Sequence, residues 1–197
     1  MDPEKSSSSE AVVQFALTCL GDLSHTLQVT RSSLLLFDAL KSLHKDGAAE
    51  RYFLECGAML HDIGWMQGWK GHHKNSLKMI LENKKLPFSN KEKLIIGSIA
   101  RYHRKTLPDI SHDHYAALSP SERKIVSRMA SLLRIADGLD YAHGDHLKDL
   151  TCIIHPTDVV IQCQVSTYST EEEKQAYQKA DLFEKVFKRR IFLRFIE

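Results

Sequence analysis

The chain has 197 residues, of which 43% are hydrophobic, and its formal net charge is +2 at pH 7. This length allows one sizeable core, and the nearly balanced charge gives no general reason to bind nucleic acid or an anionic membrane. No apolar run approaches the roughly 18 residues that span a bilayer. The serine-rich start lacks the apolar core of a signal peptide, and the four cysteines are widely spaced. We therefore expect a cytoplasmic protein with reduced thiols.

Residues 1–9 are expected to form a flexible lead-in, and residues 10–148 a helical domain. Apolar residues at helical spacing, together with capping-box starts at Ser89 and Ser119, define the helices. The predicted helices cover about 9–20, 22–43, 47–62, 72–83, 89–103 and 119–141.

The pattern changes after about residue 148. Alternating and β-branched residues predict strands over 151–154 and 159–165, and a last apolar run over 191–195 suits a third strand. A helix is expected over about 171–188. We therefore predict a mainly α fold: a helical bundle carrying a small α/β appendage over 149–197, made of a β-hairpin, a helix and a strand.

Histidine is unusually frequent, with 11 residues, and His61-Asp62 ends an apolar helical run just before Gly64. Imidazole nitrogen and carboxylate oxygen together suit Zn, Mn, Fe or Mg. Consecutive helical residues diverge by about 100°, so this pair alone cannot enclose an ion. Other helices of the bundle offer further candidate ligands, namely His25, His72, His103 and Asp137.

A histidine, a later His-Asp pair and a distant aspartate, in this order, resemble the signature of the HD superfamily of metal-dependent phosphohydrolases. Four strings narrow the resemblance: GHHKNS (71–76), IARYHRK (99–105), LLRIADGLD (132–140) and KADLFEKVFKRR (179–190). They look like the C-terminal HD-like region of the exopolyphosphatase/guanosine pentaphosphate phosphatase (Ppx/GppA) family, from about residue 20 onward. In larger members the chemistry resides in N-terminal actin-like domains, which these 197 residues do not include, and some members have lost the His-Asp pair. Its retention here favours a metalloenzyme with an HD-domain bundle.

The resemblance implies a role for each candidate residue. One divalent ion would be held by His25, His61, Asp62 and Asp137, and Asp62 would bridge to a second ion held by His72 and His103. We assign His61 and Asp62 as the catalytic pair, and one or two ions of Mn, Mg, Fe, Co or Zn as the cofactor. The expected reaction is hydrolysis of a phosphoester or phosphoanhydride by metal-activated water. Candidate contacts to the substrate phosphate are Lys70, His73, Lys74, Arg104, Lys105 and Arg134.

Two other readings remain open. A non-catalytic module could bind polyphosphate or a guanosine polyphosphate, or partner a separate phosphatase domain, with Lys and Arg side chains alone. A structural helical adaptor is the other. The expected partner is a small phosphorylated substrate or polyphosphate, without nucleic acid or membrane, and the appendage strands could pair across a homodimer. We read Trp65 and Trp69 as packing or substrate-stacking residues. The remaining histidines are expected at the surface: His44, His112, His114, His143, His146 and His155.

Overall fold

The computed structural model describes residues 3–197, with side chains from residue 9 onward. Its first helix, α1, covers Pro3–Leu20, so residues 3–9 are helical where we expected a flexible lead-in; residues 1–2 lie outside the described part. The buried side chains of Val12 and Ala16 anchor the second half of α1 in the core. Extending a helix that is already formed costs little, which accounts for the longer element.

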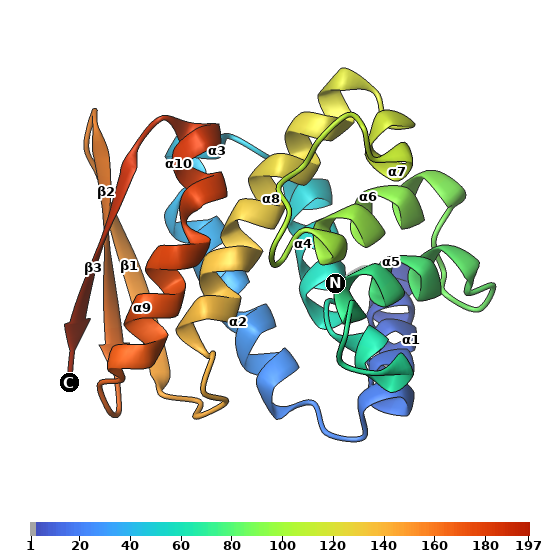
Figure 1. Cartoon of the computed structure of the whole chain (residues 1–197), viewed down its shortest axis with the longest axis horizontal. Coiled ribbons are helices and arrows are strands. Elements are labelled where there is room, and N and C mark those ends of the chain that lie inside the picture. Colours follow the sequence, from blue (N-terminus) through green and yellow to red (C-terminus); the bar gives the residue numbers. More distant parts are fainter. Residues whose placement is uncertain (1–2) are drawn as a thin grey trace.

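Helices form the body of the molecule (Figure 1). Two helix starts confirm the predicted caps, because the hydroxyls of Ser89 and Ser119 accept the backbone N–H groups of Glu92 and Glu122. The predicted helix over 22–43 is interrupted at Leu40. The body comprises α2 (Ser24–Ala39), α3 (Lys41–His44), α4 (Ala48–Met59), the 3-10 helix η1 (Ile63–Gln67), α5 (His72–Glu82), α6 (Asn90–Arg101), α7 (Asp113–Ala116) and α8 (Pro120–Leu139).

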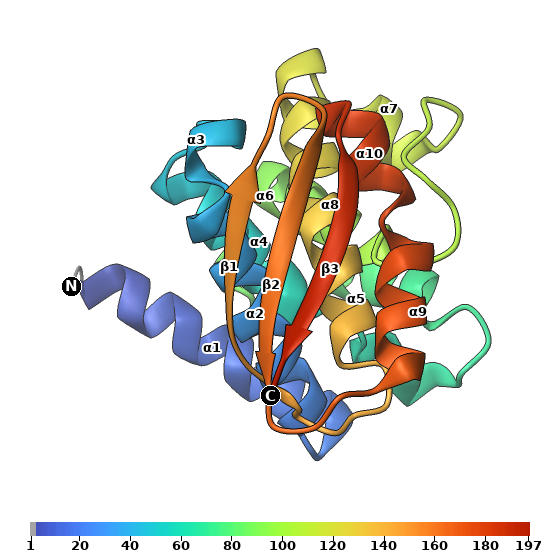
Figure 2. The ribbon, with the colours of Figure 1, turned by 90° about the vertical axis from the view of Figure 1, so that its left-hand side faces the viewer.

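A three-stranded sheet with two helices follows the body. Strand β2 (Asp158–Val165) lies between β1 (Leu147–Ile154), which is antiparallel to it, and β3 (Arg190–Ile196), which is parallel. Between β2 and β3 run α9 (Thr170–Lys179) and α10 (Asp181–Phe187), so the single helix predicted over 171–188 is broken at Ala180. The helices lie on one face of the sheet, and the described chain leaves the other face open (Figure 2).

The long helix α8 lies at the centre and joins the two parts. It packs against α2, α4, α6, α9 and α10, and one continuous cluster of buried apolar side chains extends from these helices to the sheet. At its end, a Cβ on Gly138 would lie 2.6 Å from the Cα of Ala176, so the absence of a side chain there lets α9 approach closely. This contact brings the end of α9 beside the end of α8.

The predicted mainly α fold with a small α/β appendage is therefore confirmed. Among the described helices, none has the length and apolarity to cross a membrane. One expected surface histidine, His44, is instead buried: its Nε2 bonds the Phe37 carbonyl at 2.7 Å, and its Nδ1 accepts the Asp46 backbone N–H at 2.9 Å. It satisfies a carbonyl in the last turn of α2 and an N–H just after α3, which is why burial is tolerated.

Candidate metal centre

His61 and Asp62 lie in the tight turn between α4 and η1. A Cβ on Gly64 would lie 2.0 Å from the His72 carbonyl oxygen, so only glycine lets η1 rest on α5. The Ser76 hydroxyl donates to the His61 carbonyl at 2.7 Å and accepts the Gly64 N–H at 2.9 Å. These contacts fix the His-Asp pair against the helix that carries His72.

Three buried histidines share one arrangement. In each, Nδ1 lies within hydrogen-bond distance of the backbone carbonyl three residues earlier. The distances are 2.6 Å for His61 and Ala58, 3.1 Å for His72 and Trp69, and 2.7 Å for His103 and Ala100. A carbonyl only accepts, so Nδ1 carries a proton, and the neutral form of each ring is the tautomer with an unprotonated Nε2, which is the form in which imidazole binds a metal.

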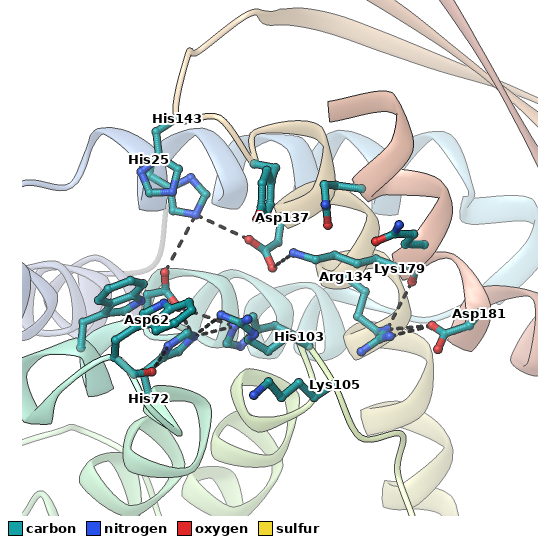
Figure 3. Close-up of a pocket in the computed structure, with 16 residues that line it drawn as sticks. His25, Asp62, His72, His103, Lys105, Arg134, Asp137, His143, Lys179 and Asp181 are labelled. Carbon is teal, nitrogen blue, oxygen red and sulfur yellow. Dashed lines mark hydrogen bonds and ion pairs between the residues drawn. The ribbon is translucent and has the colours of Figure 1, made fainter. Parts of the chain in front are cut away.

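Asp62 lies between two pairs of histidine Nε2 atoms, one of His25 and His61 and the other of His72 and His103; Figure 3 shows Asp62 with His25, His72 and His103. Its Oδ2 is 3.5 Å from Nε2 of His61 and 4.0 Å from Nε2 of His25. Its Oδ1 is 3.2 Å from Nε2 of His72 and 3.5 Å from Nε2 of His103. Asp62 thus belongs to two triads: the first is His25, His61 and Asp62, and the second is Asp62, His72 and His103. Within each triad the ligand atoms all lie within 4.8 Å of one another.

Asp137 approaches the first triad from α8. Its Oδ1 is 3.6 Å from Nε2 of His25, while its Oδ2 accepts a hydrogen bond from Nζ of Lys179 at 2.5 Å. One carboxylate oxygen thus faces the triad, and the other is held by an ammonium group from the end of α9 (Figure 3). The six side chains selected as ligands from the sequence therefore converge in this structure.

The donor set fits a divalent cation on two counts. Nε2 of His72 and Nε2 of His103 face each other at 3.3 Å, although neither has a proton to donate in the tautomer fixed by its carbonyl. Nε2 of His61 and Oδ1 of Asp62 are buried without a hydrogen-bond partner among the described residues. Buried acceptors normally have partners; Nε2 of His72 has one in Nη1 of Arg104 at 3.4 Å, and a cation would supply a partner to the other atoms.

The protonation states agree with this fit. Burial lowers the pKa of His72, and it lowers that of His103 well below the usual range, so both rings stay neutral. For Asp62 burial acts to raise the pKa, but electrostatic interaction with the surrounding histidine side chains, foremost His61, outweighs burial and lowers the pKa. The pKa of Asp137 also falls, because the Lys179 ammonium and the nearby His25 side chain outweigh its burial. Neutral imidazoles and ionised carboxylates are the forms that ligate metals.

A cavity of about 540 Å³ opens onto these side chains. Its cationic wall comes from Arg104, Lys105, Arg134 and Lys179, and Trp65 and Trp69 line it as well. The Trp65 ring stacks on His72, with centroids 5.0 Å apart, and so covers one side of the second triad.

The predicted phosphate contacts divide into two groups. Arg104, Lys105 and Arg134 line the cavity, although the Arg134 guanidinium is bound at 2.7 Å to Asp181. The other three, Lys70, His73 and Lys74, are described but do not belong to its lining. Lys70 and Lys74 are exposed, and the buried His73 ring lies at 85° to that of His72, because neighbouring residues on α5 point in different directions.

Reasoning from the sequence missed four side chains at this site. Asp140 bonds Nδ1 of His25 at 2.8 Å, and Lys179 and Asp181 line the cavity from the appendage. His143 is exposed, as expected, but its ring also stacks on the His25 ring with centroids 3.9 Å apart. The spacing of Asp137 and Asp140, one helical turn apart, is a signal that could have identified Asp140.

Comparison with known proteins places the chain in a family. No curated protein matches it significantly. A family model described as Ppx/GppA phosphatase, domain III, matches residues 9–184, which is most of the chain. The match covers the helical body and most of the appendage, and it agrees with the family that the four sequence strings resemble. The chain therefore belongs to the Ppx/GppA phosphatase family, through its domain III.

Proposed function

We propose that the chain is an HD-type metal-dependent phosphohydrolase that cleaves a phosphoester or phosphoanhydride in a small phosphorylated substrate. The observation that carries the proposal is the position of Asp62. Its two oxygens face two separate pairs of Nε2 atoms, His25 with His61 and His72 with His103. A carboxylate between two histidine pairs is suited to bridge two cations, and a phosphate-binding module has no need of it.

In this proposal His25, His61, Asp62 and Asp137 hold one divalent ion, and Asp62, His72 and His103 hold a second. A bound ion would lower the pKa of water from about 15.7 to near 7 and so supply hydroxide at neutral pH. The His/Asp set accepts Mn, Mg, Fe, Co or Zn.

The chain's own contribution is to bind and orient the phosphoryl group. Arg104, Lys105 and Lys179 lie on the cavity wall beside the two triads. Their positive charges would stabilise the charge that develops on phosphoryl oxygens. A cavity of about 540 Å³ falls within the range of small-molecule sites, so a nucleotide or a short polyphosphate is a suitable substrate.

The second candidate, a non-catalytic module that binds polyphosphate or a related anion, has one observation in its favour. Asp137 is already neutralised by Lys179 at 2.5 Å in the protein alone. A site that had lost its metal could be maintained by such an ion pair. The module needs only the cations of the cavity wall, whereas the enzyme needs the histidines and Asp62 as well.

The test is a phosphate-release screen on nucleotides, phosphomonoesters and inorganic polyphosphate, with Mn, Mg, Fe, Co or Zn supplied singly. We expect metal-dependent release that falls at least about 100-fold in Asp62→Asn, since loss of a ligand should exceed the effect of losing an outer-shell partner. Asp46→Asn is the matched control, because Asp46 is a buried carboxylate paired with Arg128 outside the cavity lining. Polyphosphate binding without bound metal or phosphate release would instead support the module.

A further inference from the structure

The turn that follows α8 encloses His25. Asp140 ends the helix and is only 1% exposed. Its Oδ2 accepts a hydrogen bond from Nδ1 of His25 at 2.8 Å, and its Oδ1 accepts the backbone N–H of Asp145 at 3.0 Å. Both carboxylate oxygens are thus engaged, one by the imidazole and one by the turn itself, so the carboxylate has a single fixed orientation.

The same turn also fixes the plane of the His25 ring. His143 stacks on it with centroids 3.9 Å apart and an angle of 11° between the planes. To do so His143 adopts a φ of 57°, and Asp145, two residues later, has a φ of 50°. Left-handed conformations are uncommon for residues other than glycine, although Asp and His tolerate them better than most, and here they belong to the turn that places the His143 ring against His25.

His25 needs such support more than the other three histidines. His61, His72 and His103 each bond Nδ1 to the carbonyl three residues earlier. His25 is the second residue of α2, and it bonds Nδ1 to the carboxylate of Asp140. A charged acceptor makes a stronger hydrogen bond than a carbonyl and makes the ring more basic.

We propose that Asp140 is a positioning residue that holds the His25 ring with its Nε2 toward Asp62 and Asp137, and that His143 fixes the plane of this ring from the same turn. This inference rests on the proposed metal site. Asp137 and Asp140 are one helical turn apart, so the end of α8 engages both nitrogens of His25: Asp137 faces Nε2 at 3.6 Å, and Asp140 bonds Nδ1 at 2.8 Å. The helix end and its turn together orient one ligand.

The test compares Asp140→Asn with the wild type by calorimetric titration of Mn²⁺ alone. Asparagine has nearly the same shape but lacks the charge, so we expect affinity at the first site to fall about 10- to 100-fold. The second site, built on Nε2 of His72 and His103, should keep its affinity. Asp46→Asn is again the matched control: it removes a buried carboxylate charge and should lower stability without changing Mn²⁺ affinity.

A second measurement does not depend on metal. Nitrogen NMR of the metal-free protein, recorded at a pH at which the His25 ring is neutral, reports which ring nitrogen carries the proton. The wild type should protonate Nδ1, and Asp140→Asn should shift a measurable fraction to Nε2. Unchanged affinity together with an unchanged tautomer would overturn the positioning role. If the wild type binds no Mn²⁺ but Asp140→Asn still shifts the tautomer of His25, the proposed function is refuted and the orienting role of Asp140 stands.

Discussion

Metal binding should release a proton from His25. Burial acts to lower the pKa of this residue, but the nearby carboxylates of Asp137 and Asp140 outweigh burial and raise the pKa to about 9. In the protein alone His25 is therefore protonated at neutral pH, and a proton on Nε2 excludes a metal. At pH 7 about 1% of the side chain is neutral, which reduces the binding free energy of an ion by about 2.7 kcal/mol.

The observed Mn²⁺ affinity of the first site should rise about tenfold for each pH unit from about 6.5 toward 9. Calorimetric titration in two buffers of different ionisation enthalpy gives the number of protons released. Water bound to the ion can also release a proton, so the informative quantity is the difference from His25→Gln, which we expect to be about one proton near pH 7.

The exposed His155 supplies the control, since His155→Gln should release as many protons as the wild type. The reasoning is refuted if His25→Gln and the wild type release the same number, or if Mn²⁺ affinity is independent of pH over this range.

Three more predictions concern stability and affinity. In the metal-free protein, kept so by a chelator, the raised pKa of His25 stabilises the fold. This contribution to the free energy of unfolding is fully present below about pH 6.5 and is lost as the pH rises through about 9. Urea denaturation should therefore show that the wild type loses about 3 kcal/mol of stability over this range and that His25→Gln does not. Lys179→Gln should tighten Mn²⁺ binding about tenfold by calorimetry, because the Asp137 charge is no longer shared with an ammonium. Gly64→Ala should lower the free energy of unfolding by about 2–3 kcal/mol in thermal denaturation and weaken binding of the second ion, since the added Cβ meets the His72 carbonyl.

Each of these has a contrary outcome. Equal pH profiles of unfolding for the wild type and His25→Gln would mean that the His25 pKa is not raised. Weaker Mn²⁺ binding in Lys179→Gln would mean that the lysine orients Asp137 as a ligand and does not oppose the ion. For Gly64 the matched control is Gly47→Ala, whose Cβ would meet only the flexible Glu50 side chain at 3.3 Å; equal costs at both positions would exclude the close approach to α5 as the cause.

The local elements were largely predictable because their signals are local. Ser89 and Ser119 mark helix starts by hydrogen bonds within one turn. The helix breaks at Leu40 and Ala180 could not be predicted, because no glycine or proline marks them. Packing against other elements decides where these helices end. The parallel pairing of β2 with β3 likewise depends on how the α9–α10 connection crosses the sheet, and no short sequence window contains that information.

The candidate ligands were found because their residue types and order are distinctive. Their partners were missed because a three-dimensional contact joins residues that are distant in sequence: Asp140 meets His25 across 115 positions, and Lys179 meets Asp137 across 42. His143 is exposed, as predicted, and nothing in its polar turn indicated that its ring would stack on that of His25. The structure adds this supporting layer around side chains that the sequence had already selected.

The most direct measurement is anomalous diffraction from a crystal grown with Mn²⁺. The account predicts a peak among His25, His61, Asp62 and Asp137, and a second peak on the far side of Asp62, beside His72 and His103. Absence of anomalous density at both triads, with the His72 and His103 nitrogens still facing each other, would contradict the central claim that Asp62 and its four histidines form a metal centre.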